Sequence, residues 1–500
     1  MKSDYNRDIY RQLAEVLERL DKTDKRIKQQ EEEHKAEIQR LKEEHKAEIQ
    51  RLKEEIAHKD KIIAEKDGII EKLKEEIERL KSQGATNSHN SSKPPSKDEP
   101  GAKKANEYNG RERSGKKRGG QEKREGRTLS GKDVEKMIAS GQYTVREETT
   151  GNSKSRHYYI EYRLDMQCEY IITKIKHYVS ESAHRLPPVT YGKQICALVV
   201  LLYSEGVVAI QRIASFIRSI SNGLINIATG TVYNICRRFA KLCSKSISEI
   251  EDKLLNAKIL YTDGTNVTVN GKQRYIRNCS TQDTVRYYFM PNKTIEELGK
   301  LTVLAKHCGT IVHDHETALY HFGTAHGECI AHLIRYLRKN TEDSGHKWSN
   351  EMIELLVKIN KLRQEAINRG EKSFQADFYS KTEAEYAAIL QHGKQENHSQ
   401  KSVWKHNEEC SLLNRLVKYK NSYLLFIKDF DVPFTNNLSE RDLRKCKNRQ
   451  KMSGGFRENS GCKMFCTILS VVETAKRRGL NLFSAISDIF LSNMVCSTGE

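Results

Sequence analysis

The stretch "KILYTDGTNVTVNGKQRYIRNCSTQDTVRYYFM", residues 258–290, predicts three β-strands. Its β-branched and aromatic residues come in runs that turn-forming residues separate, which is the pattern of strands. Asn270-Gly271 falls between "VTV" and "KQRYI". Both central positions of a type I′ turn need positive φ, which Asn and Gly tolerate best. We therefore expect the first two strands to form a tight hairpin.

The residues that follow extend these strands into a mixed sheet. "TIEELGKLTVLAKH" (294–307) is predicted to be helical, "GTIVHD" (309–314) to be a short buried strand, and "GECIAHLIRYLRK" (327–339) to be a helix. Three strands, a helix and a further strand are typical of a mixed α/β sheet.

Two acidic residues occupy notable positions in this predicted sheet. Asp263 lies in the first strand, and Asp314 ends the fourth. If those strands are neighbours, the two carboxylates lie side by side, and their repulsion raises a pKa unless a cation sits between them. Mg²⁺ prefers such oxygen ligands. Spacing alone leaves other readings open, since either residue also fits a helix cap or a surface charge, and Asp263 precedes Gly264 and fits a turn.

A third carboxylate precedes a basic run in "FDVPFTNNLSERDLRKCKNRQKMSGGF", residues 430–456. Glu440 would complete a site for two metal ions, and the basic side chains after it would bind phosphates. Arg444 follows Glu440 by one helical turn, so we expect both on one helical face. The predicted phosphate-binding residues of this run are Arg441, Arg444, Lys445, Lys447, Arg449 and Lys451.

Composition favours a polyanionic partner. The 500 residues carry a formal net charge of +19 with a pI near 9.2, which suits DNA, RNA or an anionic membrane surface. The length predicts two to four folding units. No apolar run reaches membrane-spanning length, and the twelve cysteines are scattered without an export signal. We expect a cytoplasmic protein with reduced thiols and no membrane partner.

Residues 1–83 predict a charged helix. "HKAEIQRLKEE" occurs at 34–44 and again at 45–55, and from Ile49 onward apolar residues follow a heptad pattern that Lys59 and Lys66 interrupt. Such a stripe predicts a coiled coil, because one helix cannot bury it alone. A single solvated helix held by Glu–Lys pairs is the alternative.

The segment 84–130 is polar and basic, with ten Lys/Arg against four Glu between 102 and 127. It fits either a disordered arm that binds phosphates, through Lys116, Lys117 and Arg118, or a solvated linker. Residues 131–185 contain a Tyr- and Ile-rich stretch with partial alternation, which predicts a small β-rich unit. Helical patterns fill 186–255. They fit a DNA-binding helix-turn-helix or an ordinary helical packing domain.

Three blocks resemble the DDE transposases of the insertion-sequence-sixty-six family (TnpC type). They are "YTDGTNVTVNGKQRYIRNCST", "GTIVHDHETALYHFGTAHGECIAHLIRYLR" and "VPFTNNLSERDLRKCKNRQKMSGGF". The resemblance implies a ribonuclease-H-like catalytic core whose catalytic, metal-binding acids are Asp263, Asp314 and Glu440, with two Mg²⁺ or Mn²⁺ ions. Cys329, His332, Arg335, Asn436 and Asn437 belong to the matching blocks, and we expect them to support the site.

Two features depart from the resembled pattern. Gly264 stands where the family usually has a second acidic residue, which puts activity in question. Paired cysteines of a zinc module are absent, because Cys168 alone remains between 130 and 190, so we expect no zinc.

The resulting domain prediction divides the chain into eight segments. They are a coiled coil (1–83), a disordered basic linker (84–130), a small β-rich unit (131–185), a helical domain (186–255), the first part of the core (256–345), a helical insertion (346–428), the second part of the core (429–482) and a C-terminal tail (483–500).

The function that the resemblance implies is metal-dependent cleavage of DNA at transposon ends and strand transfer into target DNA. It implies a bacterial, nucleoid-associated protein that acts as a homo-oligomer through its coiled coil, with small accessory proteins of the same element. The alternatives are a stand-alone metal-dependent nuclease of the same fold and a catalytically inactive, transposase-derived DNA-binding protein.

Overall fold

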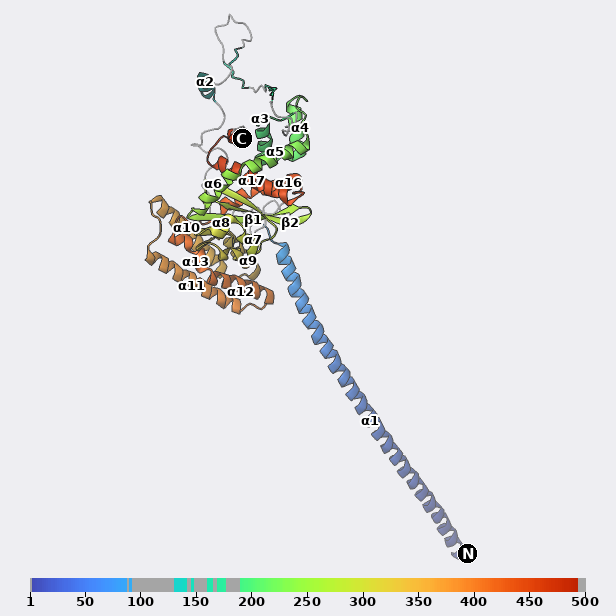
Figure 1. The fold of residues 1–500 in the computed structure, drawn as a ribbon. Coiled ribbons are helices and arrows are strands. Elements are labelled where there is room, and N and C mark those ends of the chain that lie inside the picture. The colour runs from blue at the N-terminus through green and yellow to red at the C-terminus, as the bar shows by residue number, and fades with distance from the viewer. Residues whose placement is uncertain are drawn as a thin grey trace. The chain divides into compact units, whose positions relative to one another are not determined.

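The computed structural model describes residues 2–87, 90–91, 130–141, 145–147, 160–164, 169–176 and 189–492 (Figure 1). The chain forms two compact units. The first comprises residues 1–99, 338–349 and 391–414, and the second comprises residues 100–337, 350–390 and 415–500.

The second unit contains a mixed sheet, as the sequence predicts, but the sheet has five strands where the sequence predicts four. Its order is β3-β2-β1-β4-β5; β1, β2 and β3 are antiparallel, and β4 and β5 run parallel to β1. The hairpin turn has Asn270 at φ 49° and Gly271 at φ 70°, which confirms the predicted positive angles. The strands are β1 (Ile259–Val269), β2 (Lys272–Ser280), β3 (Val285–Met290), β4 (Thr310–His313) and β5 (Ala325–Glu328).

The fifth strand corrects the sequence interpretation. The sequence predicts that Gly327 and Glu328 begin a helix, but they belong to β5, and helix α9 begins only at Ile330. The strand forms because β4 offers a free edge to pair with, which a local pattern does not reveal.

Helices cover the sheet. The outer edge of β3 is closed by α17, whose Ser470 and Thr474 hydroxyls accept the backbone N–H groups of Tyr287 (2.9 Å) and Val285 (3.1 Å). Helix α15 packs on β1 and β2. The elements here are α6 (Ser244–Leu255), α7 (Ile295–Gly299), α8 (Thr302–Lys306), the 3₁₀ helix η2 (Thr317–His321), α9 (Ile330–Ser344), α15 (Asn437–Asp442), α16 (Arg444–Ser453) and α17 (Asn459–Arg477).

A group of helices shares the core of the sheet. Helix α17 contacts α3, α5 and β3, so it joins this group to the sheet (Figure 1). The predicted tail, 483–500, contains most of helix α18, whose Phe490 ring lies 5.3 Å from that of Phe239. The members are α3 (Lys193–Ser204), α4 (Ile210–Ile220), α5 (Thr229–Leu242) and α18 (Leu482–Ser492).

The segment predicted to be a helical insertion, residues 346–428, is mostly helical. Within the first unit, the buried Glu409 carboxylate accepts hydrogen bonds from Asn340 (2.9 Å) and from the Trp348 indole (2.6 Å), and it contacts His346 Nδ1 at 2.9 Å. The helices are α10 (Trp348–Asn368), α11 (Ala376–His398), α12 (Val403–Lys418), α13 (Lys420–Tyr423) and α14 (Leu425–Lys428).

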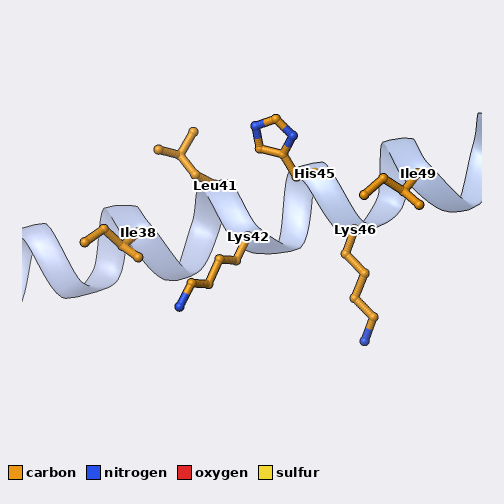
Figure 2. Close-up of a pocket in the computed structure, with 6 residues that line it drawn as sticks. All are labelled: Ile38, Leu41, Lys42, His45, Lys46 and Ile49. Carbon is orange, nitrogen blue, oxygen red and sulfur yellow. The ribbon is translucent and has the colours of Figure 1, made fainter.

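The N-terminal segment is a single long helix, α1 (Lys2–Gly84). Its apolar residues are about half exposed, from Ile9 to Leu80. Figure 2 shows Leu41 and His45 leaving one side of the helix while Lys42 and Lys46 leave the other. The long helix agrees with the sequence; its pairing in a coiled coil stays a prediction.

The sequence predicts a small β-rich unit over residues 131–185, but the described residues of this range contain no strand. Gly131–Ala139 form helix α2, while residues 160–164 and 169–176 have no regular structure. Ile172 is 97% exposed, so it packs against almost nothing among the described residues. Cys168, Lys116, Lys117, Arg118 and most of the predicted linker lie outside the described residues.

Candidate active site

Strand register brings Asp263 and Asp314 together. In the parallel pair β1 and β4, Ile259 opposes Thr310 and Tyr261 opposes Val312. The same offset, continued by two residues, places Asp314 level with Asp263. Residues in register on neighbouring strands project to the same side of a sheet. Both line a cleft of about 470 Å³, together with Gly264, Lys293 and Glu316 among others.

Glu440 lies close to Asp314 on the short helix α15, and its charge acts on that carboxylate. Asn278 of β2 fixes that helix, because its fully buried amide donates to Asp442 Oδ2 (2.9 Å) and accepts from the Ser439 hydroxyl (2.7 Å). The same amide oxygen accepts the backbone N–H of Asp263 at 2.9 Å. One side chain therefore positions both the strand that carries the first acid and the helix that carries the third.

His332 of α9 lies between the second and third acids. Its Nδ1 atom is 3.5 Å from Asp314 Oδ1 and 3.7 Å from Glu440 Oε1. Arg335 donates to its Nε2 at 3.1 Å, so the neutral ring carries its proton on Nδ1, toward the carboxylates. Burial, followed by the charge of Arg335, lowers the pKa of His332.

The burial and closeness of the acids raise the pKa values of the two aspartates. Burial, and then the charge of Asp314, raises the pKa of Asp263 from 3.8 to about 6. Burial, and then the charge of Glu440, raises the pKa of Asp314 from 3.8 to about 6. The buried atoms Asp314 Oδ1 and Glu440 Oε1 have no hydrogen-bond partner among the described residues. Repelling carboxylates with unsatisfied oxygens are what a hard divalent cation neutralises, so these residues fit such an ion.

The other candidate metal group is Asp314 with Cys329 and His332, whose potential ligand atoms lie within 4.8 Å of one another. The Cys329 sulfur already accepts the backbone N–H of Asn436 (3.2 Å), and burial raises the pKa of its thiol strongly. A protonated thiol is a poor ligand. The same loop is tied to β1, since Asn436 Nδ2 donates to the Thr262 carbonyl at 2.9 Å. Cys329 and Asn436 thus hold the site together, and Asn437 begins α15.

Sequence reasoning missed an ion pair beside the first acid. The guanidinium of Arg277, which is 1% exposed, donates to Glu316 Oε2 (2.5 Å) and to the Thr262 hydroxyl (3.1 Å). A Cβ on Gly264 would lie 3.2 Å from this guanidinium. The glycine therefore leaves room for Arg277, and Glu316 balances its charge. The sequence signal for this ion pair was Arg277 beside Asn278, two polar residues in a buried strand.

Comparisons with known proteins decide the family. Residues 188–464, more than half of the chain, match the family described as "Transposase IS66 family". The chain belongs to the IS66 family of transposases. It is also 34% identical over 77 residues to the "Uncharacterized protein y4jO" of Sinorhizobium fredii (strain NBRC 101917 / NGR234). That match covers 15% of this chain and 24% of the relative's length.

The basic run of this IS66 chain is divided by the structure. Arg441, Arg444, Lys447 and Lys451 are exposed, whereas Arg449 is buried and donates to the Val208 carbonyl at 2.9 Å. Lys445 is partly buried between Glu205 and Glu473.

The single helix predicted to carry both Glu440 and Arg444 is interrupted at Leu443, so the two residues lie on α15 and α16, and their shared face stays a prediction. Of this run, the exposed Arg and Lys side chains remain available to bind phosphates.

Proposed function

We propose that this IS66 family member cleaves DNA at the ends of its element and transfers the freed strands into target DNA. The observation that supports this most is the meeting of Asp263, Asp314 and Glu440, three acids from distant parts of the chain, of which Asp314 and Glu440 each have an unsatisfied buried oxygen. The order β3-β2-β1-β4-β5, with the first acid in β1 and the second after β4, supports a ribonuclease-H-like core.

The three acids would hold two Mg²⁺ or Mn²⁺ ions. When bound, such ions lower the pKa of an attacking water or hydroxyl and stabilise the departing oxygen of an in-line displacement. The chain's own residues set the geometry. Asn278 fixes the backbone of the first acid and the helix of the third, and His332 directs its Nδ1–H toward the other two carboxylates.

Cations around the cleft would hold the DNA. Lys293 lines the cleft itself, and the exposed Arg441 and Arg444 follow the third acid on α15 and α16. Charge-assisted contacts of Arg and Lys to phosphates position a strand without reading its sequence. The same site serves cleavage and joining, because only the nucleophile changes between water and a 3′-hydroxyl.

The long helix α1 would pair protomers, so that two DNA ends are held together. Its seam from Ile49 onward has Ile at the a positions and Leu at three of the d positions, a combination that favours parallel two-stranded coiled coils. The exposed apolar stripe is consistent with such a partner. Among the described residues, no helix has the length and apolarity needed to cross a bilayer.

The test uses purified chain, Mg²⁺, a supercoiled target plasmid, and a linear duplex that carries the DNA flanking the gene. We expect cleaved ends and joined products. Asp314→Ala should abolish both and leave DNA binding intact, whereas Asp252→Ala, an exposed acid on α6, should change neither. Cleavage without joining would instead identify a nuclease, and binding alone a non-catalytic protein.

A further inference from the structure

Helices α4 and α5 carry an uninterrupted positive charge. Between Gly206 and Ser248 the sequence has no Asp or Glu, and it has six basic residues. Within the part of the chain that the structure describes, Arg212, Arg237, Lys241 and Lys245 are exposed and have no acidic partner. The six are Arg212, Arg218, Arg237, Arg238, Lys241 and Lys245.

One face of α5 is polar along its whole length. Gly230, Asn234, Arg237 and Lys241 recur at helical spacing and are all exposed. The opposite face carries Val232, Ile235, Cys236 and Phe239, which are at most 8% exposed and pack in the core. A Cβ on Gly230 would meet nothing within 4 Å. With respect to the described residues, the exposed face is therefore open, and it is built on a helix that the core holds in place.

The connection before α5 is held rigidly. Arg218 lies near the end of α4. Its backbone carbonyl accepts the Gly223 N–H (2.8 Å), and its guanidinium donates to Asn226 Oδ1 (2.6 Å). The Ser221 hydroxyl accepts the Ile225 N–H at 3.0 Å. Asn222 and Gly223 take positive φ, which lets the chain reverse. The turn thus presents α5 in one orientation relative to α4.

We propose that α5 is a recognition helix that enters the major groove of duplex DNA and reads base edges. The groove admits one α-helix, and Asn and Arg are the side chains that pair bidentately with adenine and guanine edges. Asn234 and Arg237 read bases, while Arg212, Lys241 and Lys245 contact phosphates. The α5 face has no apolar residue, which favours DNA over a lipid surface.

This inference rests on the proposed function only for the choice of DNA as partner. Binding is measured in EDTA, so cleavage does not contribute. The full chain selects from a 30-bp duplex library with a randomised centre, and affinities for the selected duplex are measured by fluorescence anisotropy at several salt concentrations.

We expect the wild type to enrich one motif. Asn234→Ala and Arg237→Ala should each relax one position of that motif and weaken binding about 5- to 150-fold. Lys241→Ala should keep the motif, weaken all sequences alike and lower the salt slope by about 1. Lys253→Ala removes an exposed cation from α6 and should behave as wild type. Unchanged melting temperatures show that the variants fold.

The inference is overturned if Asn234→Ala and Arg237→Ala keep the wild-type motif and affinity. It is also overturned if the variants lose binding to anionic vesicles or single-stranded RNA while duplex binding persists. Failure of the proposed function has a different signature, because the selected duplex would then be bound through α5 and never cut in Mg²⁺.

Discussion

Replacing Asp314 by Asn should stabilise the metal-free protein. The pKa of Asp314 rises from 3.8 to about 6 on folding, through burial and the charge of Glu440. Two pKa units correspond to about 3 kcal/mol, which falls to about 1–2 kcal/mol because the side chain is one-third exposed and partly screened. An acid with a raised folded-state pKa destabilises the fold above that pKa. The gain from Asp314→Asn should therefore be present at pH 7.5 and vanish below about pH 4.

The assay is hydrogen exchange of the β1 and β4 amides, since a chain with two compact units need not unfold in one step. In EDTA at pH 7.5, Asp314→Asn should exchange more slowly than wild type. In Mn²⁺ at a hundredfold excess over its dissociation constant, wild type should gain about 2.7 kcal/mol and the variant should gain nothing. The exposed control Asp252→Asn should match wild type in both buffers. Faster exchange of Asp314→Asn in EDTA would show that the Asp314 charge does not destabilise the metal-free fold.

Further variants test the scaffold. Asn278→Ala should lower the local stability of β1 and α15 by about 3 kcal/mol in hydrogen exchange, because buried donors lose their partner. The control Asn266→Ala removes an exposed amide and should have almost no effect. Equal effects of the two changes would contradict the positioning role of Asn278. Glu409→Gln should destabilise the insertion by about 2 kcal/mol in urea titrations followed by tryptophan fluorescence, and its exposed neighbour change Glu408→Gln should not. Lys59→Leu should strengthen self-association in sedimentation velocity if the α1 seam pairs protomers, and unchanged association would argue against that seam.

The sheet was predictable where local chemistry specifies it. Asn270-Gly271 determines the hairpin, and the apolar run that ends at Asp314 determines β4. The sequence leaves open whether β1 and β4 are neighbours, and the structure shows that they pair in parallel. The short strand β5 was missed because its four residues include His326 and Glu328, whose burial depends on distant partners. Glu328, for example, accepts from the Tyr320 hydroxyl at 2.6 Å and pairs with His313 of β4, contacts that a local pattern does not reveal.

Roles that depend on tertiary contacts were also beyond the sequence. Arg449 has the same local context as its exposed neighbours, yet it is buried over the Tyr203 ring, 4.6 Å from the centroid. Its partner carbonyl lies 241 residues away. Similarly, the sequence suggests only that Gly264 replaces an acidic residue. In the structure, the space beside Gly264 holds Arg277 and its partner Glu316.

The most direct test of the account is a count of bound Mn²⁺ by electron paramagnetic resonance during titration of the full chain at pH 7.5. We expect two ions per chain, close enough to couple magnetically, and none of that affinity in a variant with Asp263, Asp314 and Glu440 all changed to Ala. If the triple variant binds as many ions as tightly as wild type, the three carboxylates are not the metal site.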